Sequence, residues 1–257
     1  MGYPSATLLV GSCEPFSGKS ALVMGLAQQF RNRGLPFRYG KPLATSLEQQ
    51  GQSETLIDDD VRFVGEFFSL PETALLPSLQ AIAAPTAQQQ LLTGEQVAAP
   101  QAMAPRSPLL RSVTVGELVQ RLGAEMLCCR ERKDLLVETL SIGAMNVNSA
   151  MEFFRRQRNM AVVTGADRTD IQLAALEAST QCLILTGAAD PLPQLISRAQ
   201  ELDVPLIKVE HDTLTTVAVI EKAFGHVRLH EPVKASYAAR MVAEHCSFEP
   251  LFERLGF

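Results

Sequence analysis

The chain has 257 residues, of which 46% are hydrophobic and 20% charged, a composition typical of a folded protein with one or two domains. Its 23 Lys and Arg against 28 Asp and Glu give a formal net charge of -5 without a basic cluster, which argues against nucleic-acid binding. No apolar run approaches the roughly 20 residues of a membrane helix, and no signal-peptide core is evident, so we expect a cytoplasmic protein without a membrane partner. The five cysteines lack paired spacing and predict buried thiols.

The first predicted elements are a short strand at residues 7–10, a glycine-rich turn, and a helix that ends before Gly34. In such a turn the backbone amides attract phosphate, a lysine adds positive charge, and a serine hydroxyl reaches a magnesium ion. The turn therefore predicts a nucleotide site with ATP and Mg²⁺ as cofactors and Ser20 as a metal ligand. Its expected binding residues are Gly11, Ser12, Gly18, Lys19 and Ser20. The alternative is an ordinary glycine-serine turn with a solvated lysine.

The spacing of this turn departs from the common phosphate-binding loop. Six residues separate Gly11 from Gly18, where the common pattern has about four. The longer loop resembles that of the dethiobiotin synthetase and cobyrinic acid synthase branch of the P-loop proteins. The sequence YGKP at residues 39–42 resembles the Lys-Pro on the second strand of that branch. The resemblance implies that Lys41 faces the substrate, and Lys41 joins the predicted nucleotide site.

Few further elements are predicted in this first part of the chain. A second strand is expected at residues 36–40 and a helix at residues 58–68, whose three initial aspartates suit the helix dipole. We interpret these aspartates as a helix cap, because a metal-binding carboxylate should follow an apolar strand. Glu138, which ends the apolar run 134–138, is a rival carboxylate. Since a working P-loop domain has about five parallel strands, residues 1–82 are predicted to be a shortened P-loop NTPase-like unit.

The rest of the chain predicts a linker and a parallel α/β domain. Residues 83–109 are rich in Ala, Pro and Gln, as linkers are. A helix at 114–122 and a regular alternation of strands and helices then indicate a domain at 110–230. The expected strands are 135–139, 160–164, 182–186 and 206–209, and the expected helices are 148–156, 169–178, 191–202 and 213–224. A docked helical tail is expected at 231–257.

Polar residues follow three of these predicted strands. Because the carboxyl ends of parallel strands share one edge of a sheet, their hydroxyls, an arginine and helix starts should converge on a polar or anionic ligand. The predicted ligand-binding residues are Thr164, Gly165, Asp167, Arg168, Thr169, Asp170, Thr186, Gly187, Asp212 and Thr213. The alternative is that Asp167, Thr169 and Asp212 are helix caps and that Arg168 pairs with an acid. The two roles are compatible.

These residues also carry a family resemblance. The segments DRTDI at 167–171, CLILTG at 182–187 and DTLTT at 212–216 resemble the DRTGG domain over residues 110–225. The family motif ends in Gly-Gly where this chain has Asp170 and Ile171, so the similarity rests on the surrounding pattern. The resemblance implies a regulatory module, related in fold to the N-terminal domain of HPr kinase and found in CBS-containing pyrophosphatases.

The order of the two parts resembles a larger arrangement. A P-loop unit followed by a DRTGG domain is similar to the non-catalytic N-terminal region of long bacterial phosphate acetyltransferases and to stand-alone cyanobacterial proteins. The segments SIGAMNVN at 141–148 and AVVTG at 161–165 are close to theirs. Relatives carry further P-loop strands where this chain has residues 94–108, and no acetyltransferase catalytic domain follows here. Acetyl transfer by this chain alone is therefore not expected, and the different residues at 94–108 argue against ATP hydrolysis.

Three functions are compatible with these features. The first is a regulatory or sensory protein that binds a small molecule or nucleotide, with weak or lost nucleotide binding at the turn. The second is an ATP-dependent carboxylase or amide ligase of the dethiobiotin synthetase type, with Lys19 and Ser20 on the phosphates and Lys41 near the substrate. The third is a scaffold for a separate acetyltransferase chain or another protein, and a homo-oligomer is a further expectation. His226 and His230, four apart, are an incomplete metal candidate.

Overall fold

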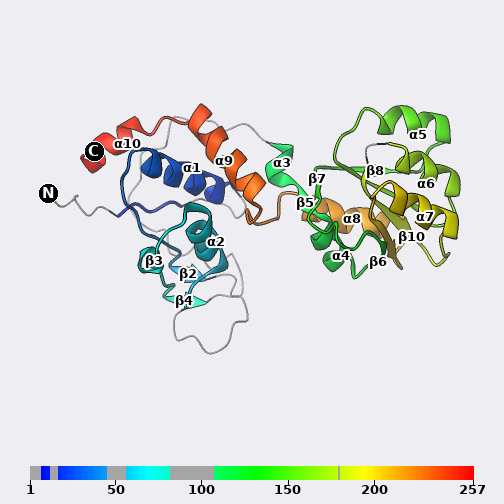
Figure 1. Cartoon of the computed structure of the whole chain (residues 1–257), viewed down its shortest axis with the longest axis horizontal. Helices are drawn as coiled ribbons and strands as arrows, with labels where there is room; N and C mark the ends of the chain where they lie inside the picture. The colour runs from blue at the N-terminus through cyan, green and yellow to red at the C-terminus, as the bar shows by residue number, and fades with distance from the viewer. Residues whose placement is uncertain (1–6, 12–16, 45–55, 82–106, 179) are drawn as a thin grey trace. The chain divides into compact units, whose positions relative to one another are not determined.

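The computed structural model describes residues 7–11, 17–44, 56–81, 107–178 and 180–257 (Figure 1). The chain forms two compact units, Met1–Arg106 with Arg228–Phe257, and Ser107–Val227. The expected boundaries were 82, 109 and 230, so the structure differs chiefly in assigning the C-terminal tail to the first unit. Among the described helices, none combines the length and hydropathy that a bilayer span requires.

The second unit is built on one five-stranded sheet in the order β6-β11-β10-β9-β8. Four strands are parallel: β8 (Thr139–Ile142), β9 (Met160–Gly165), β10 (Thr180–Thr186) and β11 (Leu206–Val209). The last three lie where strands were predicted, whereas β8 shares only Thr139 with the strand predicted at 135–139. The fifth, β6 (Glu125–Cys128), runs antiparallel to β11 at the edge of the sheet and was not predicted. The α/β class with a mainly parallel sheet is therefore confirmed.

Helices cover both faces of this sheet, which explains why the middle of its central strands is apolar on both sides. Successive side chains of a strand point to opposite faces, so Val163 and Ile184 enter one core while Val162 and Leu183 enter the other. The first core is closed by α4 (Val115–Leu122) and α8 (Thr213–Ala223). The second is closed by α5 (Val147–Phe154), α6 (Thr169–Leu176) and α7 (Pro193–Glu201).

The predicted strand at 135–139 is divided in two. Its first half is β7 (Leu136–Val137), which pairs antiparallel with β5 (Val113–Thr114) just after the short helix α3 (Pro108–Arg111). The chain then changes partner at Glu138, whose backbone N–H donates to the carbonyl of Asn159, and continues as β8 beside β9. Glu138 thus lies in the second unit and is no carboxylate of the first.

The first unit has little sheet in the described residues. Its elements up to residue 81 are α1 (Lys19–Asn32), β1 (Tyr39–Gly40), β2 (Leu43–Ala44), α2 (Asp59–Phe68), η1 (Glu72–Ala74), β3 (Leu75–Leu76) and β4 (Gln80–Ala81). The strands form two parallel pairs, β1 with β3 and β2 with β4. The strand predicted at residues 7–10 is wrong: these residues have no regular structure, and Leu9 is 59% exposed. A parallel strand is buried by neighbours on both sides, and the described residues supply none there.

The C-terminal tail completes the first unit. It forms α9 (Pro232–His245) and α10 (Glu249–Leu255), and α9 packs along α1 (Figure 1). Gly25 makes this packing close, because a Cβ built on it would lie 2.2 Å from Cγ1 of Val242. The rings of Phe30 and Phe252 meet edge to face at 5.2 Å between centroids. The expected docked tail is therefore an integral part of this unit's core.

Candidate functional site

The carboxyl ends of the parallel strands bring three predicted threonines together. The hydroxyl of Thr164, at the end of β9, donates to the carbonyl of Gly143 over 3.1 Å. The hydroxyl of Thr186, at the end of β10, donates to the carbonyl of Thr164 over 3.3 Å and lies 2.8 Å from the hydroxyl of Thr213, the first residue of α8. Two of the predicted hydroxyls, those of Thr186 and Thr213, thus meet at this edge, whereas the hydroxyl of Thr164 is bonded to Gly143.

Glycines shape the turns that leave this edge. A Cβ on Gly165 would lie 2.4 Å from Oδ1 of Asp167, so glycine lets that carboxylate lie close to the strand end. Gly187 has φ +91°, in the left-handed region that favours glycine. A close contact at Gly165 and the backbone conformation at Gly187 therefore both favour glycine at this edge.

Gln172 is a site residue that the sequence reasoning missed. Its side chain is fully buried in α6 and its Nε2 donates to the carbonyl of Gly165 over 2.8 Å. Its Oε1 is buried without a hydrogen-bond partner. The available signal was a polar residue inside an apolar helical stretch, residues 171–176.

Arg168 lies just before α6 and is held in two ways. Its Nη2 donates to the carbonyl of Met145, in the loop after β8, over 3.2 Å, and its Nε donates to Oδ1 of Asp170 over 3.3 Å. The hydrogen bond from Arg168 is the main reason why the pKa of Asp170 lies below its ordinary value. Because 39% of the Arg168 side chain is exposed, its charge remains accessible. The contact between Arg168 and Asp170 also agrees with the alternative expectation that this arginine pairs with an acid.

Asp212 is the N-cap of α8. Its carboxylate accepts hydrogen bonds from the backbone N–H of Thr215 over 2.9 Å and from the hydroxyl of Thr215 over 2.8 Å. These bonds lower the pKa of Asp212. Asp212 and Asp167 are both exposed, and Thr169 is the first residue of α6. The edge thus combines two helix N-termini with hydroxyls and one arginine, a set that suits an anionic group.

The glycine-rich turn is only partly described. Ser12 lies outside the described residues, and Gly11 has no regular structure. Gly18 precedes α1 with φ 91°, and Lys19 and Ser20 are the first two residues of that helix. Burial, and then the positive charge of Lys41, lower the pKa of Lys19. The two predicted lysines therefore interact electrostatically.

Lys41 lies between two aspartates of the α2 start. Its Nζ donates to Oδ1 of Asp58 over 3.0 Å and to Oδ2 of Asp60 over 2.6 Å. Asp58 is the predicted helix cap: it is fully buried and accepts from the backbone N–H of Asp60 over 2.9 Å. The role of Lys41 in facing a substrate remains a prediction.

Asp60 and His230 meet in a cluster that the sequence reasoning did not predict. Nε2 of His230 lies 2.6 Å from Oδ1 of Asp60, and Nη1 of Arg228 lies 3.5 Å from the same oxygen. Burial alone would raise the pKa of Asp60, but the hydrogen bond from His230 and the charge of Lys41 outweigh it and hold that pKa far below its ordinary value. His230, named with His226 as an incomplete metal candidate, thus lies at hydrogen-bonding distance from a carboxylate.

A small pocket joins this cluster to the glycine-rich turn. Its lining residues are Ser20, Val23, Met24, Tyr39, Asp60, Phe63, Val64 and Leu229. Burial and the nearby charges of Asp60 and Asp58 raise the pKa of the Tyr39 hydroxyl, which therefore stays protonated. The sequence suggested that the three aspartates at the start of α2 only cap the helix. One of them, Asp60, lines the same pocket as Ser20.

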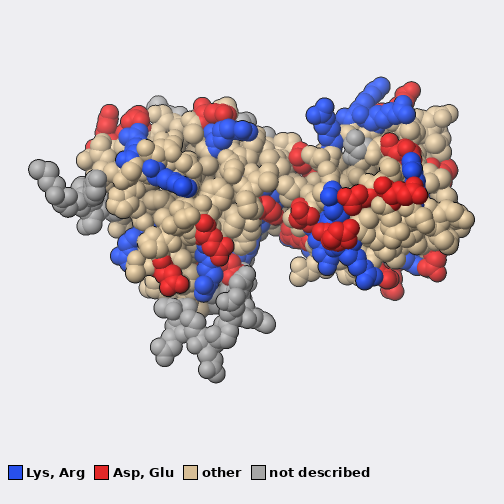
Figure 2. Space-filling view, in the orientation of Figure 1, with Lys and Arg blue, Asp and Glu red and all other residues tan. Residues whose placement is uncertain are grey.

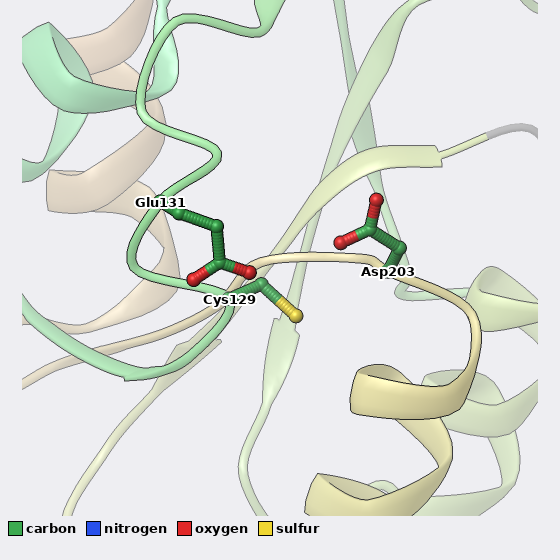
Figure 3. A group of neighbouring side chains, drawn as sticks. All are labelled: Cys129, Glu131 and Asp203. Carbon is green, nitrogen blue, oxygen red and sulfur yellow. The ribbon is translucent and has the colours of Figure 1, made fainter.

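A third group, in the second unit, brings possible metal ligands together. Ligand atoms of Cys129, Glu131 and Asp203 lie within 4.8 Å of one another (Figure 3). Burial, followed by the neighbouring Cys128, raises the pKa of Cys129 to about 12, which keeps the thiol protonated and a poor ligand. Asp203 is paired with Arg132 at 3.0 Å. We assign no metal site to this group.

The charged side chains are mixed in sign over the face shown in Figure 2, where Lys and Arg alternate with Asp and Glu on both units. This distribution fits the overall charge of -5. A broad positive surface of the kind that follows a nucleic-acid backbone is not seen on the described part of that face.

Comparison with known protein families matches residues 117–223 to the DRTGG domain. The second unit therefore contains a DRTGG domain, at residues 117–223. The predicted resemblance is confirmed despite the departure at Asp170 and Ile171. The strand-edge residues described above, from Thr164 to Thr213, all lie inside the matched range.

Individual relatives extend this result. Phosphate acetyltransferase of Nitratidesulfovibrio vulgaris is 25% identical over 161 residues, which cover 59% of this chain and 23% of that protein. The uncharacterized protein YtoI of Bacillus subtilis is 26% identical over 114 residues, 44% of this chain and 25% of that protein. Cobalt-dependent inorganic pyrophosphatase of Clostridium perfringens is 26% identical over 113 residues, 44% of this chain and 20% of that protein. The chain thus spans a quarter or less of each relative.

One solved structure is also similar. It contains the CBS and DRTGG domains of the regulatory region of Clostridium perfringens pyrophosphatase, in complex with the activator diadenosine tetraphosphate. The similarity has a TM-score of 0.41 and 23% sequence identity, and it covers 48% of this chain and 54% of that chain. The similarity to phosphate acetyltransferase is confirmed, whereas the dethiobiotin synthetase and cyanobacterial resemblances remain predictions.

Proposed function

We propose that this protein is a regulatory protein whose DRTGG domain binds a small phosphorylated ligand, such as a nucleotide, at the carboxyl edge of its sheet. The observation that supports this most is the pair of hydrogen-bonded hydroxyls of Thr186 and Thr213, of which Thr186 also donates to the backbone carbonyl of Thr164, beside Arg168 and the N-termini of α6 and α8. Hydroxyls, helix starts and a guanidinium are the groups that bind phosphate in proteins.

The named chemistry of the relatives favours the same class of ligand. Phosphate acetyltransferase and inorganic pyrophosphatase are enzymes of phosphate and pyrophosphate chemistry by their names. We infer that the present chain responds to a metabolite of that chemistry and transmits its presence to a protein partner. An acetyltransferase chain is the first partner to test, by co-purification.

Calorimetric titration of the full chain tests the proposal. The probes are ATP, ADP, diadenosine tetraphosphate and acetyl-CoA, each added to the wild type, to Arg168→Ala and to Arg156→Ala. We expect at least one probe to bind and its Kd to rise about tenfold in Arg168→Ala, a loss of about 1.4 kcal/mol. Arg156 follows α5 and is exposed outside the strand-edge residues, so its variant is the matched control. The proposal is contradicted if the Kd is the same in the wild type and in Arg168→Ala, or if no probe binds.

The glycine-rich turn supports a second candidate function. Because Ser20 and Asp60 line one pocket and Lys19 interacts with Lys41, the first unit retains groups that suit a magnesium nucleotide. We infer weak nucleotide binding there in the present state of the chain. An ATP-dependent ligase is the alternative, and magnesium-dependent ATP turnover that Lys19→Ala abolishes would establish it.

A further inference from the structure

We propose that Gln172 is a positioning residue of the ligand site at the carboxyl edge of the DRTGG sheet. Its side-chain amide holds the turn at residues 165–168 in the conformation that presents Arg168 to an anionic ligand. The inference rests on the proposed function of that edge and concerns the second unit alone. It gives a reason for a polar side chain that lies in the core of this unit.

Gln172 is an exception in the helix that carries it. Helix α6 closes one core of the unit with apolar side chains such as Ile171 and Ala175, both of which are fully buried. The side chain of Gln172 is also fully buried, and its Oε1 has no hydrogen-bond partner among the described residues. A buried polar atom without a partner lowers the stability of the fold. An apolar side chain of similar size would therefore suit this position better if folding alone decided it.

The amide nitrogen of Gln172 binds the end of β9. Nε2 donates to the carbonyl of Gly165 over 2.8 Å. The same carbonyl accepts from the backbone N–H of Arg168 over 3.1 Å, which closes a tight turn. Inside this turn, the backbone N–H of Ala166 donates to the carbonyl of Thr186 over 2.9 Å. The carbonyl of Gly165 is thus satisfied without Gln172, and the additional bond fixes the turn rather than rescuing a buried backbone group.

The turn that Gln172 holds carries two opposite charges, those of Asp167 and Arg168. Oδ1 of Asp167 would lie 2.4 Å from a Cβ built on Gly165, so this carboxylate is folded against the strand end. The guanidinium of Arg168 instead reaches the carbonyl of Met145 over 3.2 Å, and 39% of its side chain is exposed. A different conformation of the turn would move both charges relative to an anion at this edge. Gln172, which is itself buried, therefore acts on the ligand through Arg168.

The same bond ties the turn to the start of α6. Gln172 is the fourth residue of this helix, and the first turn of an α-helix has backbone N–H groups without intrahelical partners. Because the side chain of Gln172 reaches back to Gly165, it fixes the spacing between the guanidinium of Arg168 and these N–H groups. A fixed arrangement of cationic and N–H groups lowers the cost of ordering the site when an anion binds.

Two matched substitutions in the full chain separate positioning from folding. Gln172→Met removes the amide at the strand edge. Gln181→Met removes an amide near the amino end of β10, where Nε2 of Gln181 donates to Oδ1 of Asn159 over 2.7 Å. Each protein is unfolded by heat and titrated by calorimetry with ATP, ADP, diadenosine tetraphosphate and acetyl-CoA.

The two variants should change opposite properties. For a probe that binds the wild type, we expect Gln172→Met to raise the Kd about tenfold. Its unfolding temperature should be equal to or above that of the wild type, because the substitution removes a buried oxygen without a partner. Gln181→Met should instead lower the unfolding temperature and leave the Kd unchanged, because it breaks a bond away from the strand edge.

Hydrogen exchange tests the clamp without a ligand. The backbone N–H of Arg168 should exchange faster in Gln172→Met than in the wild type, while the protection of β9 stays the same. If Gln172→Met is overpacked and does not fold, the smaller Gln172→Leu should give the same results.

The possible outcomes separate this inference from the proposed function. If a probe binds Gln172→Met as tightly as the wild type while Arg168→Ala weakens its binding, the positioning role is overturned and the proposed function stands. If both variants at residue 172 are less stable than the wild type or unfolded, Gln172 only supports the fold and the inference is overturned. If no probe binds the wild type, the proposed function fails and the inference fails with it.

Discussion

Single residues decide how the first unit is held together, and Asp60 is the most constrained of them. Its carboxylate satisfies Lys41 on one oxygen and His230 on the other. Such charge-assisted bonds are worth about 1.5–3 kcal/mol each when formed, and removing one partner leaves the other poorly satisfied. The residue that the sequence presented as one of three cap aspartates is therefore the centre of an ion-pair network.

The variant Asp60→Asn should destabilise the first unit by about 2 kcal/mol near neutral pH. Because the folded pKa of Asp60 is depressed below its unfolded value of about 4, its stabilising contribution is present above that value and is lost as the pH falls below it. Denaturant unfolding of both proteins between pH 6 and pH 3 should show the difference shrinking with acidity. A difference that stays constant would contradict the assigned ion pairs.

In the DRTGG domain, Thr186 is the residue whose side chain links two elements, because its hydroxyl contacts both β9 and α8. Thr186→Val keeps the shape of the side chain but removes the bonds to the carbonyl of Thr164 and the hydroxyl of Thr213. We expect a loss of about 1 kcal/mol in unfolding free energy, measured by denaturant titration, together with weaker ligand binding. Thr215→Val is the control within α8, since its hydroxyl bonds only to the exposed cap Asp212. Equal losses of unfolding free energy and of ligand affinity in the two variants would contradict a specific role of the strand edge.

At the scale of elements, the close approach of α1 and α9 depends on a glycine. Gly25→Ala should favour the isolated helix by up to about 1 kcal/mol, yet its Cβ would lie 2.2 Å from Val242. The cost of overpacking, about 1–3 kcal/mol, should exceed the gain in helix propensity. We therefore expect the thermal unfolding temperature to fall. Adding Val242→Ala should recover part of the loss, and a strictly additive double variant would show that the two helices are not in contact.

The elements of the DRTGG domain could be predicted from sequence more closely than those of the first unit. β9 to β11 are mainly apolar runs between polar turns, and β11 was predicted with its observed bounds. β6 escaped prediction because an edge strand of four residues carries little pattern. The strand expected at 7–10 had the right composition, but burial depends on neighbours that composition does not reveal.

The candidate sites show the same limit. Parallel topology predicted that Thr164 and Thr186 meet, because strand ends share one edge. It could not predict that His230 meets Asp60, since 170 positions separate them and the contact follows from the docking of α9. The role of Gln172 could not be predicted from the sequence, because it depends on a hydrogen bond to a single backbone carbonyl, that of Gly165.

At the scale of the whole molecule, one unit is continuous in sequence and the other is not. The DRTGG unit runs from Ser107 to Val227, whereas the first unit is assembled from both ends of the chain. The DRTGG unit has two cores of its own, one on each face of its sheet. The first unit takes Val242 and Phe252 from the tail to cover α1. The two units should therefore respond differently to loss of the tail.

Deletion of residues 228–257 is expected to unfold the first unit and to leave the DRTGG domain folded. The deletion uncovers the face of α1 around Met24, Gly25 and Phe30 and removes both partners of the Asp60 Oδ1 oxygen. Hydrogen exchange should show fast exchange in α1 and α2 but unchanged protection in β9, β10 and β11. The matched experiment produces residues 107–227 alone, which should unfold in one cooperative transition. Protection that survives in α1 after the deletion, or loss of protection in the DRTGG strands, would show that the chain is not divided in this way.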